Sequence, residues 1–360
     1  MRVLVTGPAL ADPGGVSGYH GAVLPHLRAS VGAVEYLEIG SSRGRGGCLH
    51  PLADQAQFRA AVRRLRPQIV QVNPSLNAKS FLRDGLLARQ AAQRRIPVLV
   101  FFHGWDPRFE ARLERSRRRF FAATYRRATA FVVLADAFRQ RLRAWGVTAP
   151  IHLATTAVAS ELVQGFAFDR KPLYDGASRP LRMLFLARLE RGKNVRVVLE
   201  ALASLRRRGA PVTLTVAGDG EDLPALRRFA AGHPELAEAI TIAGDVRGAR
   251  KHELFASHDV YCLPSASEGM PASVLEAMAF GLPVIAAPAG GLADVLEDGR
   301  TGCVLSQLTA AAIADAVSRL QADPPRLRAI AAHNHRYALA HFLAPAVAER
   351  LAAIYRALAR

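Results

Sequence analysis

Cysteine is scarce in this chain of 360 residues, which has only Cys48, Cys262 and Cys303. The three are far apart and form no C-x-x-C pair, which argues against a disulfide framework and against a zinc site. No window holds about 18 uninterrupted apolar residues, so we expect no membrane-spanning helix. The opening MRVLVTG is typical of a strand entering a glycine turn and not of a signal peptide. These absences predict a protein of the reducing cytoplasm.

Acidic residues and lysine are also few beside arginine. Lys and Arg together number 48 against 30 Asp and Glu, a formal charge of +18, and only four of the 48 are lysines. Residues 1–165 hold 24 basic and 10 acidic residues, whereas residues 166–360 hold 24 and 20. An N-terminal half with this excess of positive charge could bind nucleic acid, an anionic membrane surface or a phosphorylated substrate. A general preference for arginine would give the same count.

Short β-branched runs alternate with helical stretches along the chain. Most runs are continuously apolar, which is typical of strands buried on both faces of a parallel sheet. The repeating strand–helix order predicts doubly wound α/β domains. The predicted strands are residues 3–6, 69–72, 98–102, 131–134, 183–186, 213–217, 241–243, 260–263 and 283–286. Predicted helices include residues 55–65, 195–207, 223–231 and 273–279.

The domain organisation is predicted from one break in this pattern. Residues 165–180 contain two prolines, two glycines and no periodicity, which is typical of a linker. We predict an N-terminal, acceptor-side Rossmann-like domain over 1–165, a linker over 166–180 and a nucleotide-sugar-binding domain over 181–340. The apolar stripe of residues 341–360 predicts a last helix, expected to return to the N-terminal domain. The two predicted domains would face each other across a cleft.

Glu268 and Glu276 flank a polar, glycine-containing loop and the start of a predicted helix. The loop follows the apolar run 260–263, and open α/β sheets bind ligands beyond the carboxyl ends of their strands. The N–H groups at a helix start suit a phosphate, and a carboxylate can accept hydrogen bonds from two ribose hydroxyls. The alternative is a glutamate that only stabilises the helix N-terminus through the macrodipole.

The wider segment SEGMPASVLEAMAFGLPVIA, which starts at Ser267, resembles the E-x7-E signature of retaining family 4 glycosyltransferases, enzymes with the two-domain GT-B fold. The resemblance is strong over residues 180–302 and looser over residues 1–165. It implies that Glu276 holds the ribose of a nucleotide-diphosphate sugar and that Glu268 holds the hydroxyls of the transferred sugar. The other implied donor-binding residues of this segment are Gly269, Met270, Pro271, Ala272, Ser273 and Val274.

Arg188 and Lys193 follow the predicted strand 183–186. Two cations at a strand end can hold a diphosphate, the arginine through its fork and the lysine as a point charge. The resemblance implies that they bind the donor diphosphate and stabilise it as it leaves; an ordinary pair of surface cations is the alternative. It also implies a donor contact from Gly218, in a Gly-x-Gly turn, and from Val246, beside the base.

In the N-terminal half, Gly14 and Gly15 form a loop after the first strand, where glycine lets the backbone approach a ligand closely. The spacing is not G-x-G-x-x-G, so the nicotinamide fingerprint is absent. His103 follows the apolar run 98–102, and the resemblance implies that it contacts the donor sugar or supports the reaction centre, although a lone histidine is commonly structural. Asp106 is a weaker candidate for an acceptor contact.

The segment that begins at Arg108 and ends at Arg127 holds eight arginines and two glutamates among apolar residues. It is typical of a basic amphipathic helix, which can lie on anionic lipid. Family members that act on lipid-linked acceptors often use this region for membrane contact. The alternative is a solvated helix packed on its own sheet.

These features predict a retaining glycosyltransferase that moves a sugar to a glycan, lipid-linked or small-molecule acceptor in bacterial cell-surface polysaccharide or glycolipid synthesis. We expect no cofactor and no metal, because two cations and a helix start already meet the phosphates and no D-x-D motif occurs. No helix-turn-helix, zinc or RNP-type motif supports nucleic-acid binding. Alternatives are a catalytically silent GT-B sugar-nucleotide-binding protein and a GT-B epimerase. The expected location is cytoplasmic, or peripheral on the inner face of the membrane.

Overall fold

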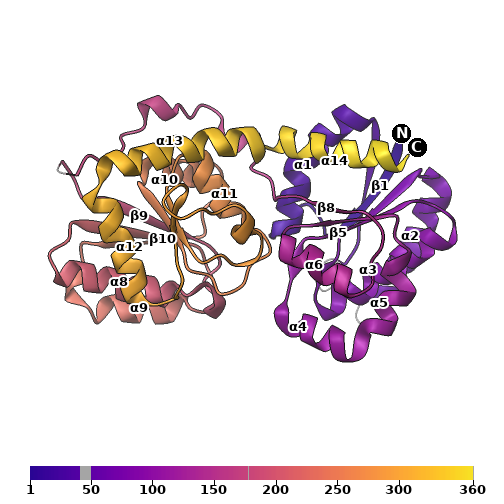
Figure 1. The fold of residues 1–360 in the computed structure, drawn as a ribbon, viewed down its shortest axis with the longest axis horizontal. Helices are drawn as coiled ribbons and strands as arrows, with labels where there is room; N and C mark the ends of the chain where they lie inside the picture. Colours follow the sequence, from indigo (N-terminus) through magenta and orange to yellow (C-terminus); the bar gives the residue numbers. More distant parts are fainter. Residues whose placement is uncertain (41–49, 177, 360) are drawn as a thin grey trace. The chain divides into compact units, whose positions relative to one another are not determined.

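The computed structural model describes residues 1–40, 50–176 and 178–359. Cys48 lies outside the described residues. The chain forms two compact units, each of which has its own parallel sheet (Figure 1). Unit 1 comprises Met1–Ala157 together with Ala344–Arg360, and unit 2 comprises Val158–Leu343.

Unit 1 is built on a six-stranded parallel sheet with the strand order β2-β1-β3-β5-β7-β8. The strands are β1 (Arg2–Gly7), β2 (Ala33–Glu38), β3 (Ile69–Val72), β5 (Val98–Phe102), β7 (Ala130–Val133) and β8 (Ile151–Leu153), and β4 (Ser75–Leu76) pairs separately with β6 (Gly104–Trp105). The helices are α1 (Gly15–Val31), α2 (His50–Leu65), α3 (Ala78–Gln93), α4 (Pro107–Arg112), α5 (Arg118–Thr124), α6 (Asp136–Ala144) and α14 (Ala344–Leu358).

Unit 2 repeats this plan with the strand order β11-β10-β9-β12-β13-β14. The strands are β9 (Leu181–Leu186), β10 (Val212–Ala217), β11 (Ile240–Gly244), β12 (Val260–Leu263), β13 (Val284–Ala286) and β14 (Gly302–Val304). The helices are α7 (Ser160–Val163), α8 (Val195–Arg207), α9 (Leu223–Ala231), α10 (Gly248–Ser257), α11 (Ala272–Ala279), α12 (Ala310–Ala322) and α13 (Pro324–His341). Helix α8 packs beside α12, and α11 packs beside α13.

Most predicted strands coincide with the buried centre of each sheet, whereas the predicted strand 241–243 is part of the edge strand β11 (Ile240–Gly244). Every residue of β3, β5, β7 and β12 is buried, because helices cover both faces of the sheet (Figure 1). The sequence prediction missed β2, β8 and β14, each of which is the outermost strand of its sheet. These three strands are paired on one side only and are partly exposed, and their sequences lack the long apolar run on which the prediction relied.

The division between the units differs from the predicted one. It falls between Ala157 and Val158, ahead of the segment predicted as a linker, and residues 166–176 pack within unit 2. The Lys171 side chain is buried, and its Nζ donates to the carbonyls of Phe255 (3.0 Å) and Phe280 (2.9 Å). Residues 166–176 therefore form a strap, an irregular segment that is fixed to the surface of unit 2. A proline- and glycine-rich composition alone does not distinguish such a strap from a linker.

The last helix of the chain, α14, lies in unit 1 beside α1 (Figure 1). Its buried side includes Val347, Leu351 and Tyr355, which belong to the apolar stripe seen in the sequence. The Tyr355 hydroxyl donates to Oε1 of Gln71 in β3 at 2.5 Å. The C-terminal segment is therefore part of the core of unit 1.

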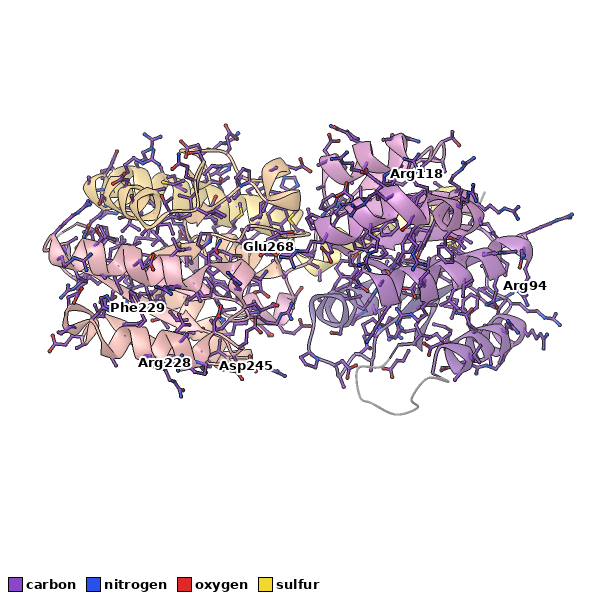
Figure 2. The ribbon with its side chains drawn as sticks, turned by 90° about the horizontal axis from the view of Figure 1, so that it is seen from below. Arg94, Arg118, Arg228, Phe229, Asp245 and Glu268 are labelled. Carbon is purple, nitrogen blue, oxygen red and sulfur yellow. The ribbon has the colours of Figure 1, made fainter. Side chains whose placement is uncertain are left out.

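The basic segment that ends at Arg127 is not one continuous helix. It consists of α4, a π-helical turn (Leu113–Arg117), α5 and a 3-10 turn (Tyr125–Arg127). Its large apolar side chains are packed in or against the core of unit 1, so they are not free to enter a lipid layer. The arginines are exposed, and Figure 2 labels Arg118 among them. The exposed arginines of this segment are Arg108, Arg112, Arg115, Arg117, Arg118, Arg119, Arg126 and Arg127.

Candidate active site

The predicted donor-binding residues of unit 2 gather at the carboxyl edge of its sheet. Strands β9 and β12 are hydrogen-bonded neighbours, with Met183 opposite Val260. The loop after β9 carries Arg188 and Lys193, and the loop after β12 carries Glu268 before α11 begins. Parallel neighbours end at the same edge, so residues 75 positions apart in the sequence are brought together.

Lys193 and Glu268 form an ion pair. Nζ of Lys193 lies 2.5 Å from Oε1 of Glu268, and the two side chains are 19% and 9% exposed. The lysine is held in place by the turn that contains it, because Asn194 adopts the left-handed conformation and its Nδ2 donates to Pro264 O at 2.8 Å. The structure thus places next to each other the cation expected at the diphosphate and the carboxylate expected at the sugar.

Arg188 does not join this pair. Its side chain is 80% exposed, and the guanidinium lies 2.9 Å from Oε1 of Glu190 in the same loop. Exposed ion pairs contribute little free energy, because water screens them and both side chains lose rotamer freedom. The guanidinium can therefore be redirected towards an anionic ligand at little cost.

Glu276 is paired with a residue that sequence reasoning missed. The Glu276 side chain is buried in α11, and Nζ of Lys251, on α10, lies 2.7 Å from each of its two oxygens. Only Oε1 accepts a well-directed hydrogen bond, so Oε2 keeps its acceptor capacity. The one sequence signal for Lys251 is that it is a lysine in a chain whose basic residues are nearly all arginine.

Glycines let neighbouring loops lie directly against the site. At Gly218, where φ is +141°, a Cβ atom would come within 1.9 Å of Ala187 O, just before Arg188. At Gly290, where φ is +56°, a Cβ atom would come within 2.0 Å of Glu268 O. Gly290 lies within residues 180–302, over which the family resemblance is strong. Its backbone supports the loop that presents Glu268.

The start of α11 is tied to the end of β9 by Tyr261. Its hydroxyl lies 2.7 Å from Leu186 O and 2.8 Å from Ser273 Oγ. Burial raises the pKa of Tyr261, so the phenol stays neutral and can donate. No side chain caps the N-terminus of α11. The remaining predicted donor contacts, Gly269, Met270, Pro271, Ala272 and Val274, lie in this loop and first turn, and Val246 is half-buried in the loop between β11 and α10.

In unit 1, the candidates occupy the carboxyl edge of the other sheet. Gly14 precedes α1, whose N-terminus lacks a side-chain cap, and no heavy atom lies within 4 Å of a Cβ built on Gly15. Asp106 has a structural role, because its Oδ1 accepts from Arg108 N at 2.9 Å and caps α4. His103 follows β5 and stacks on Phe101, with 3.9 Å between ring centroids. Burial lowers the pKa of His103 well below 6.5, so the ring is neutral at pH 7.

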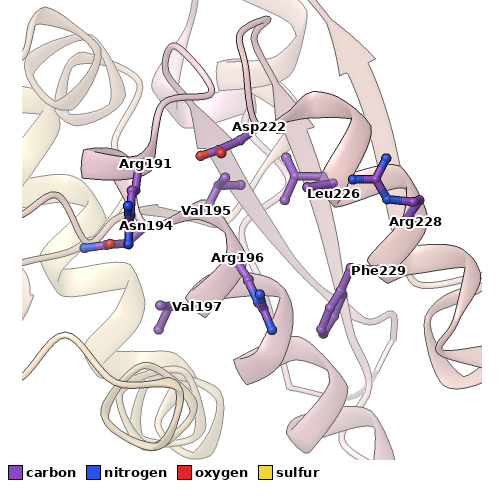
Figure 3. Close-up of a pocket in the computed structure, with 10 residues that line it drawn as sticks. Arg191, Asn194, Val195, Arg196, Val197, Asp222, Leu226, Arg228 and Phe229 are labelled. Carbon is purple, nitrogen blue, oxygen red and sulfur yellow. The ribbon is translucent and has the colours of Figure 1, made fainter.

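A groove of ≈ 610 Å³ lies between the start of α8 and α9, next to the loop that carries Lys193 (Figure 3). It is lined by Arg191, Asn194, Arg196 and Phe229, among others, and by none of the predicted site residues.

Across residues 1–40, 50–176 and 178–359, no helix is long and apolar enough to cross a membrane. The same part of the chain contains no group of His, Cys, Asp and Glu side chains suited to a metal ion.

Two family models match the chain. Residues 180–323 match the one described as glycosyl transferases group 1, and residues 20–162 match glycosyltransferase family 4. The chain is 30% identical over 202 residues to alpha-D-kanosaminyltransferase of Streptomyces kanamyceticus, covering 56% of this chain and 50% of that protein. It is 34% identical over 176 residues to a GDP-mannose-dependent alpha-(1-6)-phosphatidylinositol monomannoside mannosyltransferase of Mycolicibacterium smegmatis, covering 46% and 45%. The chain thus spans about half the length of these curated relatives.

Solved structures resemble the chain over nearly its full length. Anabaena HepE in complex with UDP and glucose has a TM-score of 0.71 at 16% identity, covering 99% of this chain and 100% of that one. Sucrose-phosphate synthase from Thermosynechococcus elongatus has a TM-score of 0.76 at 21% identity, covering 99% of both chains. Identities this low establish the GT-B fold alone. The two family models, which between them match residues 20–162 and 180–323, show that this chain belongs to family 4 of the glycosyltransferases.

Proposed function

We propose that this chain transfers a sugar from a nucleotide-diphosphate sugar to a hydroxyl acceptor, with retention at the anomeric carbon. One observation carries the proposal. Both glutamates of the E-x7-E motif lie at the carboxyl edge of the unit 2 sheet, and each is paired with a lysine: Glu268 with Lys193 and Glu276 with Lys251. Such pairs supply both the acceptors that hydroxyl groups require and the positive charge that a leaving diphosphate requires.

The roles follow from these contacts. Lys193, together with Arg188 once it is redirected, stabilises the negative charge that grows on the diphosphate as the glycosidic bond breaks. Glu268 accepts hydrogen bonds from the hydroxyls of the transferred sugar, and Glu276 uses Oε2, which is ion-paired with Lys251 but accepts no directed hydrogen bond, for the ribose. No side chain is assigned as nucleophile. The leaving phosphate oxygen takes the proton of the acceptor hydroxyl while that hydroxyl bonds to the anomeric carbon on the same face.

The substrate class is supported by the names of similar proteins. Relatives include an amylovoran biosynthesis glycosyltransferase of Erwinia amylovora and the phosphatidylinositol monomannoside mannosyltransferase already described. We therefore propose a glycan, lipid-linked or small-molecule acceptor in bacterial cell-surface polysaccharide or glycolipid synthesis. No metal or other cofactor is part of the proposal, because Lys193 and Arg188 supply the charge at the diphosphate.

The exposed arginines from Arg108 to Arg127 support a further part of this proposal, contact with an anionic membrane surface. Because the apolar side chains of the segment are buried, the contact is electrostatic and involves no insertion. Each arginine close to such a surface contributes about 1 kcal/mol, and salt weakens the attraction. Cosedimentation with vesicles containing phosphatidylserine should fall steeply as salt rises. Equal binding to neutral vesicles would exclude this contact.

Turnover of variants tests the catalytic proposal. A panel of UDP-, GDP- and ADP-sugars is first screened by donor-induced thermal stabilisation. Glu268→Gln should lower kcat on the order of 100-fold, because a contact made in the transition state is weakened. Glu276→Gln should mainly raise the KM for the donor, whereas the exposed Glu253 on α10 provides a matched control, Glu253→Gln, with unchanged kinetics. A wild-type kcat in Glu268→Gln together with a wild-type donor KM in Glu276→Gln would refute the proposal. Donor binding without transfer or hydrolysis would identify a silent binding protein.

A further inference from the structure

Four buried polar side chains form a continuous hydrogen-bonded chain within unit 1. Tyr355 of α14 contacts Gln71 of β3 at 2.5 Å, and Gln71 Nε2 lies 2.7 Å from Oδ1 of Asn73, just after that strand. Nε2 of His103, just after the neighbouring strand β5, lies 2.9 Å from the same Asn73 oxygen. Tyr355 and Gln71 are 0% exposed, Asn73 is 4% and His103 is 9%.

The direction is fixed at a backbone carbonyl. Asn73 places its amide nitrogen 2.7 Å from Thr6 O in β1, and a carbonyl oxygen can only accept. The Asn73 amide is therefore oriented with its nitrogen towards β1 and its oxygen towards Gln71 and His103. Both of these partners must then donate to that oxygen. It follows that Gln71 turns its own oxygen towards Tyr355, whose hydroxyl donates to it.

This orientation determines the tautomer of His103. The ring must carry its hydrogen on Nε2, because the Asn73 oxygen that faces Nε2 has no hydrogen to give. The ring is also held on its faces and edges by Phe101, stacked at 3.9 Å, and by Tyr19 and His20, with centroids at 4.9 Å and 5.4 Å. In a neutral ring fixed in this way, Nδ1 bears the lone pair, and it has no hydrogen-bond partner among the residues that the structure describes.

We propose that Asn73 is a positioning residue that fixes His103 as the Nε2–H tautomer, so that Nδ1 is presented as a hydrogen-bond acceptor. An acceptor nitrogen can receive a hydrogen bond from a sugar hydroxyl, whereas it repels a phosphate oxygen. His103 therefore faces a hydroxyl of a carbohydrate substrate and not the diphosphate. This last step rests on the proposed glycosyl transfer; the tautomer itself does not.

The tautomer can be read directly by nitrogen–proton correlation NMR of the full chain labelled with 15N-histidine. The chain has 11 histidines, and the signals of His103 are those missing from His103→Gln. In the wild type, Nε2 should show the shift of a protonated ring nitrogen and Nδ1 that of an unprotonated one, without change between about pH 5 and pH 8. An Nδ1–H tautomer, or titration of the ring near its ordinary pKa, would overturn the proposal.

Two variants separate positioning from stability. Asn73→Ala removes the acceptor, so His103 should populate both tautomers, and kcat should fall on the order of 10-fold with little change in donor KM. Tyr355→Phe removes the far end of the chain but leaves Asn73 bonded to Thr6, so the tautomer and kcat should stay as in the wild type. Retention of a pure Nε2–H tautomer in Asn73→Ala would also overturn the proposal. If Asn73→Ala fails to fold, the wild-type NMR spectrum still tests the tautomer of His103. If the proposed transfer activity is not found, that spectrum tests the tautomer all the same.

Discussion

Lys171 makes the stability of unit 2 depend on pH in an unusual direction. Its amine is buried against the carbonyls of Phe255 and Phe280, and Asp259 is the one carboxylate near it that raises its pKa. That carboxylate already forms a bidentate pair with Arg179, at 2.6 Å for both contacts. Burial therefore dominates and lowers the pKa of Lys171 from 10.5 to about 7.

The sign follows from proton binding. Below pH 7 the amine is protonated in both the native and the unfolded state, so the native state carries the full cost of burying the charge. Between pH 7 and 10.5 the unfolded chain binds a proton that the native state has lost, so the free energy of unfolding rises with pH. The slope is about 1.4 kcal/mol per pH unit, which amounts to roughly 2 kcal/mol between about pH 7 and pH 9.

The test compares Lys171→Met with the wild type, and the exposed neighbour variant Arg170→Met is the matched control. Other groups that titrate in this range contribute equally to all three proteins and cancel in the difference. Both tryptophans, Trp105 and Trp145, lie in unit 1, so unfolding of unit 2 is better followed by pulse hydrogen exchange of β12 in denaturant. The stability difference between wild type and Lys171→Met should change by roughly 2 kcal/mol over this range. A difference that does not vary with pH would refute the reasoning.

Three further variants probe the scaffold of the site. Gly290→Ala places a Cβ against Glu268 O and should abolish most transfer activity while unit 2 remains folded, as judged by hydrogen exchange. Asp259→Ala leaves Arg179 partly buried without its partner and should cost about 3–5 kcal/mol in the denaturant unfolding of unit 2. Lys251→Met leaves a buried carboxylate unpaired and should raise the donor KM on the order of 10-fold, measured by initial rates.

Each of these variants has a clear contrary result. Gly290→Ala at wild-type activity would mean that the Glu268 loop accommodates the methyl group. Loss of less than about 1 kcal/mol in Asp259→Ala would place the pair among ordinary surface ion pairs. For Lys251→Met, the exposed neighbour Arg250→Met is the matched control, since its partner Glu253 is also exposed. If Lys251→Met and Arg250→Met raised the donor KM equally, donor binding would depend on the total positive charge of α10 and not on the pairing of Lys251 with Glu276.

Local sequence determined the features that depend on short-range patterns. Continuous apolar runs marked β5 and β12 to the residue, because strands covered on both faces have no polar side to interrupt them. The E-x7-E spacing with its flanking glycines identified the family, because loop geometry around Glu268 and Glu276 demands particular residues at fixed offsets. These are constraints within about 20 residues, and a single sequence displays them.

Tertiary structure alone decided which side chains meet. The pairing of Lys193 with Glu268, of Lys251 with Glu276, and of Tyr355 with Gln71 joins positions 75, 25 and 284 residues apart. The same applies to the burial of Lys171, which makes a strap of a segment with the composition of a linker. Such contacts depend on which strands are neighbours in the sheet and which helices cover them. The sequence by itself therefore determined the family and the residues available for chemistry, and the fold determined their partners, because hydrogen bonds and ion pairs act over a few ångströms of space regardless of distance along the chain.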